Sequence, residues 1–105
     1  MTTRTTLPQR RYSETFELTH GGQHTPYQVT LGYYGNHQIG EVFISGSKAG
    51  STTEAVARDG AVLLSLALQF GVPLETIKRA LTREGDGMPS TIIGAVVDRL
   101  TETAT

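Results

Sequence analysis

Apolar and polar residues alternate along two segments in the first half of the chain. In the segment from Tyr12 to Thr19, Tyr12, Phe16 and Leu18 share one face with Glu14. After a break at His20–His24 that contains two glycines, Tyr27, Val29, Leu31 and Tyr33 alternate with polar residues or glycine. A period of two is typical of half-buried strands, and the short break lets the second strand pair back on the first. The pattern predicts an antiparallel pair.

A third strand is expected from Ile39 to Ser45, after the tight-turn signal Gly35-Asn36. Val42 and Ile44 lie on one face of this segment and Phe43 on the other, so both faces carry apolar residues. Strands with two apolar faces are usually buried on both sides. We therefore expect the third strand to be the best buried of a three-stranded meander, which needs a helical layer over its apolar face.

The second half of the chain supplies that layer, beginning with a long helix. Ser51 stands three residues before Glu54, which is the spacing of a capping box, and the helix is expected to continue to Phe70. From Ala61 to Phe70 the helix is apolar almost all round. A helix of this kind is expected to be central and to contact both the sheet and other helices.

Two further helices follow. Gly71 is expected just after the end of the long helix and Pro73 at the first position of the next, which carries Leu74, Ile77 and Leu81 at helical spacing and is ended by Gly85-Asp86-Gly87. Pro89-Ser90-Thr91 opens the third helix, whose apolar stripe is Ile92, Ile93, Val96, Val97 and Leu100. The predicted fold class is α+β, with a three-stranded antiparallel β-meander followed by three helices packed on one face.

Composition limits the organisation of the chain. At 105 residues, one domain is expected, spanning residues 12–101, because the first eleven residues have too few apolar groups to join a core and should form a disordered arm. Nine Lys and Arg against ten Asp and Glu argue against nucleic-acid binding through a broad positive field. There is no apolar leader or membrane-length apolar run, so we expect a cytoplasmic protein with no membrane role.

The connection between the third strand and the long helix is a candidate anion site. A strand, a glycine-containing loop and a helix N-terminus together present free N–H groups and a positive dipole end, to which Lys48 adds charge. The alternative is an ordinary helix cap, which needs the same residue types. The loop lacks the lysine placement of a P-loop. The candidate residues for a nucleotide or other phosphate ligand are Gly46, Ser47, Lys48, Gly50, Ser51 and Thr52.

The stretch from Leu66 to Leu81 has the spacing of a DNA-reading helix-turn-helix. In this alternative, Ala67 and Gly71 let two helices cross closely. The great length of the first helix and the slightly acidic net charge argue against it. Plain packing of a helix hairpin explains the same pattern. The residues that would contact nucleic acid are Thr76, Lys78, Arg79 and Arg83.

No catalytic or metal-binding constellation stands out. The chain has no cysteine, and His20 and His24 are four apart in a glycine turn, where such spacing does not hold a metal. Asp86 is explained by a plain turn, and charges such as Glu41 and Asp59 by ion pairs. We therefore predict no metal, no cofactor and no catalytic residue.

Five segments taken together resemble a known family: Leu7–Pro8, Ser13–Phe16, Gly40–Ser45, Lys48–Thr52 and Leu66–Glu75. The chain resembles the TSCPD domain and the C-terminal accessory region of adenosylcobalamin-dependent (class II) ribonucleotide reductases, over Leu7 to Leu100. The cysteine-bearing motif that names the domain would fall near Thr91–Gly94, where this chain has no cysteine.

The reductase's radical chemistry and cobalamin site belong to a large barrel that is absent from this sequence. The resemblance therefore implies a non-enzymatic accessory or binding module, with a nucleotide, another phosphate ligand or a reductase-like protein as its partner. It lowers the DNA-binding alternative and leaves open a phage- or defence-linked binder of a nucleotide signal. Self-association into a homo-oligomer is expected, because Tyr33, Tyr34 and Phe43 offer more apolar surface than one helical layer covers.

Overall fold

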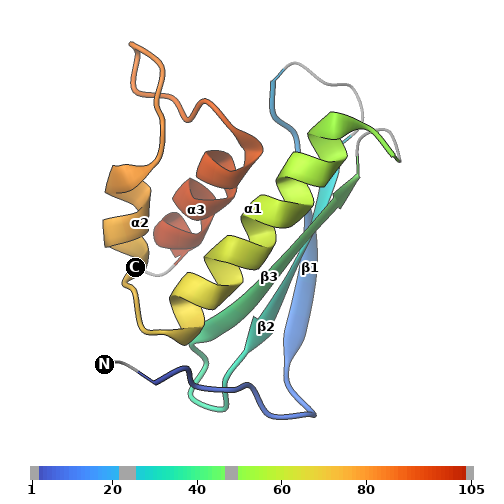
Figure 1. Cartoon of the computed structure of the whole chain (residues 1–105), viewed down its shortest axis with the longest axis vertical. Helices are drawn as coiled ribbons and strands as arrows, with labels where there is room; N and C mark the ends of the chain where they lie inside the picture. The colour runs from blue at the N-terminus through green and yellow to red at the C-terminus, as the bar shows by residue number, and fades with distance from the viewer. Residues whose placement is uncertain (1–2, 22–25, 47–49, 104–105) are drawn as a thin grey trace.

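A computed structural model describes residues 3–21, 26–46 and 50–103. Strands β1 (Ser13–Leu18), β2 (Tyr27–Tyr33) and β3 (Ile39–Gly46) precede helices α1 (Thr52–Gln69), α2 (Leu74–Ala80) and α3 (Ile92–Thr103). The strands form one antiparallel sheet in the order β1-β2-β3, and the helices lie over one face of it (Figure 1). The predicted α+β class, a meander followed by three helices, is confirmed.

The core lies between the sheet and the helices, and the strand alternation places its residues there. Val29 and Leu31 of β2 and Val42 and Ile44 of β3 are almost wholly buried on the helical side. The opposite face is mostly polar, as in the Thr15–Thr30 hydroxyl pair across β1 and β2. The apolar stripe predicted for α3 completes the core through Ile92, Val96, Val97 and Leu100.

The expectation that β3 is the best-buried strand is wrong. The strand order makes β2 central, while β3 forms an edge of the sheet. Phe43, on the side of β3 away from the helices, leaves 56% of its surface exposed. Two apolar faces therefore do not mean burial on both sides here, because the outer face of the sheet has no covering layer among the described residues.

Helix α1 begins and ends as its sequence predicts. The Ser51 hydroxyl accepts a hydrogen bond from Glu54 N–H (3.1 Å), and the Glu54 carboxylate accepts one from Gly50 N–H (3.1 Å). At the other end Gly71 has a φ of +87°, a left-handed conformation that glycine adopts readily. The cap and the stop are thus set by local residue chemistry.

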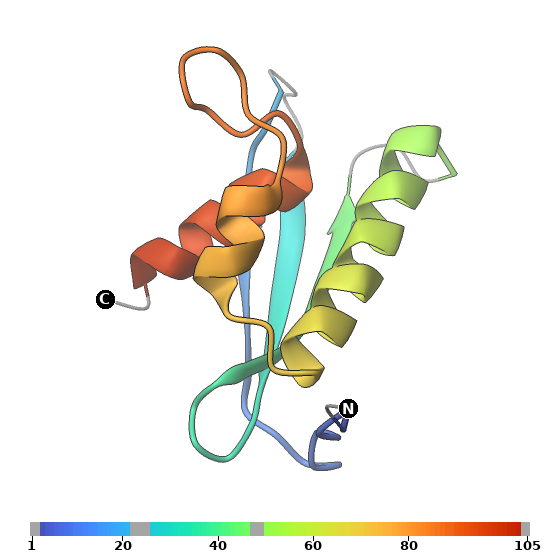
Figure 2. The same cartoon turned by 60° about the vertical axis from the view of Figure 1, so that its left-hand side comes forward.

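Helix α1 contacts both the sheet and another helix, as expected, but it is not central. The helix covers β3 and contacts α3, but its outer side faces solvent (Figure 2). Val56, Val62 and Leu63, which lie on more than one side of the helix, are 60%, 57% and 67% exposed. The apolar character of α1 therefore exceeds what the core requires.

Helix α2 is shorter than predicted. Pro73 is its N-cap rather than its first helical residue, and the helix ends at Ala80, well before the glycine-containing turn. The chain between them is extended, with a bridge between Arg83 and Pro89. The turn itself is confirmed, since the Asp86 carboxylate accepts a hydrogen bond from Met88 N–H (3.0 Å). Because Leu81 keeps its apolar contact without being helical, helical spacing alone misplaced this boundary.

The segment before β1 runs along the end of the sheet. Thr5 N–H donates to the carbonyl of Gln69 (2.9 Å), and the Tyr34 hydroxyl donates to the carbonyl of Thr5. Leu7 lies against Gly40, where a Cβ would come within 2.7 Å of Leu7 Cδ2. The disorder expected for residues 1–11 stays a prediction. No helix in the described part of the chain is long and apolar enough to cross a membrane.

Candidate functional site

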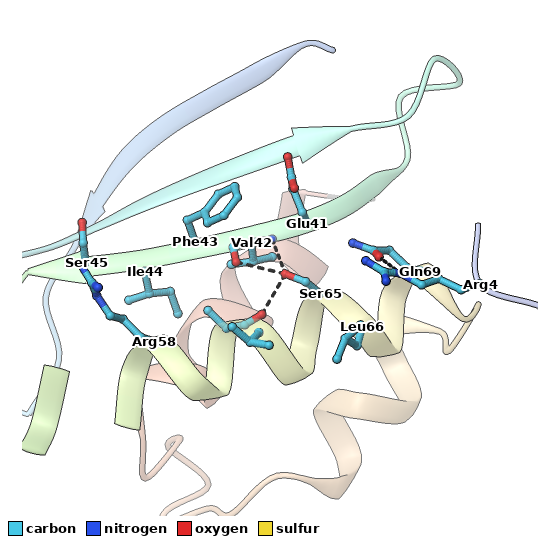
Figure 3. A pocket seen from close by; sticks show the side chains of 12 residues that line it. Arg4, Glu41, Val42, Phe43, Ile44, Ser45, Arg58, Ser65, Leu66 and Gln69 are labelled. Carbon is cyan, nitrogen blue, oxygen red and sulfur yellow. Dashed lines mark hydrogen bonds between the residues drawn. The ribbon is translucent and has the colours of Figure 1, made fainter. Parts of the chain in front are cut away.

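A groove of about 510 Å³ follows the free edge of β3, with α1 as its other wall (Figure 3). We call it the β3–α1 groove. Successive α1 residues reach it at helical spacing, so it extends along most of the helix. The residues lining it are Arg4, Glu41, Val42, Phe43, Ile44, Ser45, Arg58, Ala61, Val62, Ser65, Leu66 and Gln69.

Ser65 occupies the edge of the sheet at the middle of this groove. Its hydroxyl oxygen accepts a hydrogen bond from Val42 N–H (2.8 Å) and lies 3.1 Å from the Val42 carbonyl and 2.8 Å from the Ala61 carbonyl, to one of which it donates. The main-chain groups of Val42 therefore point away from β2, toward the outer edge. The Ser65 side chain stands where the backbone of a further strand would otherwise bind.

The alternation of a strand extends this edge to Ile44. In an antiparallel ladder, residues two apart point their N–H and C=O groups to the same side. Because Val42 turns these groups outward to Ser65, Ile44 turns its own groups outward too. Ser65 reaches Val42 but lies one full helical turn beyond Ala61, which lines the groove nearer Ile44. The edge beside Ile44 is thus a place where an added strand can pair.

Gln69 closes one end of the groove. Its side-chain N–H donates to the Gly40 carbonyl (2.8 Å), and its side-chain oxygen accepts from Arg4 Nε (2.5 Å). Gln69 is buried, and both ends of its amide are hydrogen-bonded, as a buried amide requires. This residue therefore joins the β3 edge, the end of α1 and the N-terminal segment.

The groove carries positive charge at both ends. Figure 3 shows Arg58 beside Ser45 at one end and Arg4 beside Gln69 at the other. The one carboxylate lining it, Glu41, is paired with Arg11 (2.5 Å). Neither Arg4 nor Arg58 forms an ion pair with a carboxylate in the described part of the chain. The groove therefore favours a ligand with negative groups near its ends.

Glu41 owes its position to Gly32, its cross-strand partner. A Cβ on Gly32 would lie 2.4 Å from the Glu41 carboxylate, so the glutamate lies over a site that only glycine leaves open. Its carboxylate is thereby directed to Arg11 rather than into the middle of the groove. The groove has hydroxyl, amide and guanidinium groups but no arrangement suited to bond breaking, and no cluster of metal-binding side chains occurs in the residues that the structure describes.

The structure accounts for part of the loop predicted to bind an anion. Gly46, with a φ of +129°, approaches β2 so closely that a Cβ would lie 2.9 Å from the Tyr27 Cα, while Thr52 is the first residue of α1. Gly50 and Ser51 make the two capping bonds with Glu54, which places a carboxylate at this helix end. Ser47 and Lys48 lie outside the described residues. Anion binding here stays a prediction, and capping explains the described residues.

The residues of the DNA-binding alternative do not form one free surface. Thr76 and Arg79 are exposed on α2, and Lys78 is half-buried. Arg83 instead donates to both carboxylate oxygens of Asp98 (2.5 and 3.1 Å) and to the Gly87 carbonyl (2.9 Å). The Arg83 guanidinium holds the pKa of the Asp98 carboxyl below its ordinary value. One of the four predicted contacts is thus engaged within the domain, and nucleic-acid binding stays untested.

The residues most important to the β3–α1 groove were not singled out by sequence. Ser65 and Gln69 are the two polar residues in the otherwise apolar stretch from Ala61 to Phe70, and they are four residues apart, on one side of the helix. That spacing was the available signal. A polar pair on one side of an apolar helix indicates a neighbour with main-chain groups to satisfy.

Comparison with known proteins matches the chain to one domain family and to one class of enzyme. The model of the TSCPD domain matches residues 1–103. The vitamin B12-dependent ribonucleotide reductase of Agrobacterium fabrum is 43% identical over 76 residues, covering 72% of this chain and 6% of that protein. Those of Rhodopirellula baltica and Streptantibioticus cattleyicolor are each 39% identical, over 71 and 70 residues, covering 68% and 67% of this chain.

The chain spans only 7% of the Rhodopirellula protein and 11% of the Streptantibioticus protein. In these relatives the matching region is therefore a small part of a much longer protein. No solved structure matches this chain.

Proposed function

This chain belongs to the TSCPD domain family, and from that premise we propose that it is a non-catalytic accessory module that binds an extended, acidic segment of a partner protein in the β3–α1 groove. The observation that carries the proposal is the outward-facing edge of β3 at Ile44, bordered by apolar α1 residues and by an arginine at each end. Addition of a strand to an exposed sheet edge is a common mode of peptide recognition.

The dimensions of the groove set the spacing of the acidic residues. Arg58 and Gln69, the neighbour of Arg4, are eleven residues apart on α1, which is about 16 Å at the rise of an α-helix. An extended strand covers this distance in about five residues. Two acidic side chains four positions apart also lie on the same face of a strand, so one segment can reach both arginines.

The apolar wall supplies affinity, and the edge supplies register. Val62, more than half exposed, and Leu66 can receive an aliphatic side chain between the two charges. Main-chain pairing at Ile44 fixes the direction and position of the segment. At Val42 the segment must displace the Ser65 hydroxyl, whose loss is offset by the new strand pairing.

The partner that we favour is a ribonucleotide reductase of the vitamin B12-dependent class. The support is that relatives of this chain carry the matching region within such enzymes. The β3–α1 groove offers a surface for contact with such an enzyme. Action in the cytoplasm belongs to the same proposal.

Calorimetry with two peptides tests this function. One is the acetylated and amidated heptapeptide TETVTET, which places a valine between the two glutamates on the same face, and the other, TKTVTKT, replaces each glutamate by lysine. We expect the acidic peptide to bind at least tenfold more tightly, since it alone complements Arg4 and Arg58. The Arg58→Gln variant should lose most of that preference. Equal binding of the two peptides, or no heat with either, contradicts the proposal.

A pair of valine variants provides the matched control. Val62→Asn places a polar amide in the β3–α1 groove, whereas Val56→Asn makes the same change on another side of α1 at nearly equal exposure. We expect Val62→Asn to weaken the acidic peptide about tenfold, because one buried aliphatic contact contributes about 1.5 kcal/mol. Val56→Asn should leave its affinity unchanged.

Anion binding at Gly46–Thr52 is a separate proposal with its own test. Inorganic phosphate and a panel of nucleotides, titrated into the whole chain and into Lys48→Ala, distinguish it from the peptide site. Heat that disappears in Lys48→Ala supports a phosphate or nucleotide ligand. The absence of heat with all of these ligands leaves the loop as a helix cap.

A further inference from the structure

A second groove separates α1 from the α2–α3 pair. This interhelical groove, of about 500 Å³, lies on a different side of α1 from the β3–α1 groove. Its walls are apolar: Val56, Leu63 and Ala67 from α1 face Ile77 and Leu81 of the α2 region and Ile93 of α3. Figure 2 shows α1 on one side and the α2–α3 pair on the other.

The shape of the groove follows from one close contact and one early helix end. At Gly60 a Cβ would lie 2.5 Å from Ile93 Cδ1, so α3 meets α1 at this glycine and the two helices diverge elsewhere. Helix α2 ends at Ala80, and the chain from Leu81 to Thr91 is not helical, so no helix continues along α1 beyond this point. The groove is thereby left open between the helices.

The apolar side chains at the rim of the interhelical groove are far more exposed than core residues. Leu63 and Val56 leave 67% and 60% of their surfaces accessible, and they are seven residues apart, so they lie on one line along α1. Apolar residues gathered in this way mark interaction surfaces more often than scattered ones do. A partner helix with apolar residues at the same spacing would match this line.

One charge is placed in this apolar surface. Asp59 is exposed, lines the groove between Val56 and Leu63, and is its one charged residue. It belongs to neither ion pair found within the described parts of the chain. A carboxylate set in an apolar surface disfavours any partner that cannot neutralise it.

We propose that the interhelical groove binds an amphipathic helix of a partner protein, with a lysine or arginine on its apolar side opposite Asp59. The walls are side chains of three helices and offer no sheet edge, which favours a helix over an extended strand. A second copy of this chain is a poorer occupant, because a twofold contact through this face brings two Asp59 carboxylates together. This inference is independent of the β3–α1 groove.

Fluorescence anisotropy of two fluorescein-labelled peptides, titrated with the whole chain, tests binding in the interhelical groove. Both are 18-residue helical peptides with the same leucine stripe, flanked by lysine in one and by glutamate in the other. The lysine peptide should bind at least tenfold more tightly. Asp59→Asn should reduce that preference to about threefold or less, because Asp59 is its source, and Leu63→Asn should weaken both peptides about tenfold.

For the interhelical groove, the two valine variants exchange their roles as test and control. Val56→Asn should weaken the lysine peptide, whereas Val62→Asn should leave it unchanged, so failure here is distinguishable from failure of the β3–α1 groove. Equal binding of the two helical peptides overturns the proposal, and so does binding insensitive to Leu63→Asn. A dimer seen by light scattering and abolished by Leu63→Asn also overturns it, since the occupant is then a second copy.

Discussion

Glycine at position 60 is set by the close approach of α1 and α3. Alanine is favoured over glycine within a helix by about 1 kcal/mol, but here its Cβ meets Ile93 Cδ1 and Cγ1, both at 2.5 Å. Overpacking of this kind costs about 1–3 kcal/mol. We expect Gly60→Ala to lower the free energy of unfolding by about 1 kcal/mol.

Gly60→Ala should become stabilising when the Ile93 side chain is shortened. In an Ile93→Ala background, Gly60→Ala should raise the free energy of unfolding by about 1 kcal/mol, because only helix propensity remains. Urea unfolding of the four variants of this cycle measures both effects. A stabilising Gly60→Ala in the wild-type background contradicts the close packing of α1 on α3.

The Arg83–Asp98 pair should make stability depend on acid. Arg83 lowers the pKa of Asp98 in the folded protein. The pair therefore contributes fully to the free energy of unfolding above the pKa of unfolded Asp98, which is about 3.9, and loses this contribution as pH falls through the lower folded pKa. The melting temperature of Asp98→Asn should lie below that of wild type at pH 6, and the difference should shrink as pH falls below about 4. Arg83→Gln should reproduce this profile, and a constant difference speaks against the pair.

At the scale of elements, α1 protects part of the edge of β3. Ser65→Ala leaves the outward groups of Val42 without their hydroxyl partner, so the free energy of unfolding should fall by about 1–2 kcal/mol. The acidic peptide should then bind more tightly, because it no longer displaces the hydroxyl. Urea unfolding and calorimetry measure the two effects, with Ser65→Thr as the variant that keeps the hydroxyl. Weaker peptide binding by Ser65→Ala contradicts this role.

Local patterns predicted most of the elements, and tertiary contacts decided the rest. The alternation in Tyr27–Tyr33 and the Ser51 cap depend on neighbouring residues, so sequence located both. The predicted meander already makes β3 an edge strand, but the apolar Phe43 gave no sign that its face of the sheet is uncovered. The end of α2 at Ala80 was missed because Leu81 contacts the core in either conformation.

The candidate sites were harder to predict for the same reason. Both walls of the β3–α1 groove are visible in sequence as a strand and a helix, but their juxtaposition is not. The position of Arg4 beside Gln69 joins residues 65 positions apart. The loop at Gly46–Thr52 could be identified as a candidate from sequence because its residues are consecutive.

For the whole molecule, the N-terminal segment connects the sheet to the helical layer. Removing residues 1–6 deletes the Arg4 contact to Gln69 and the hydrogen bonds made by Thr5. The free energy of unfolding should fall by about 1–2 kcal/mol, since three hydrogen bonds near the surface are lost. Hydrogen exchange adds a direct measurement. The hydrogen bonds of Thr5 predict slow exchange of its amide. The disordered arm expected from composition predicts instead the exchange rate of an unstructured peptide.

Exchange of the Ile44 amide reports whether the domain binds an extended segment at the edge of β3. In ¹⁵N-labelled protein saturated with the acidic heptapeptide, exchange at Ile44 should slow at least tenfold, because that N–H becomes part of a new strand pair. Val56→Asn should show the same slowing, and Val62→Asn should need a higher peptide concentration to reach it. Unchanged exchange at Ile44 with the peptide bound contradicts the account.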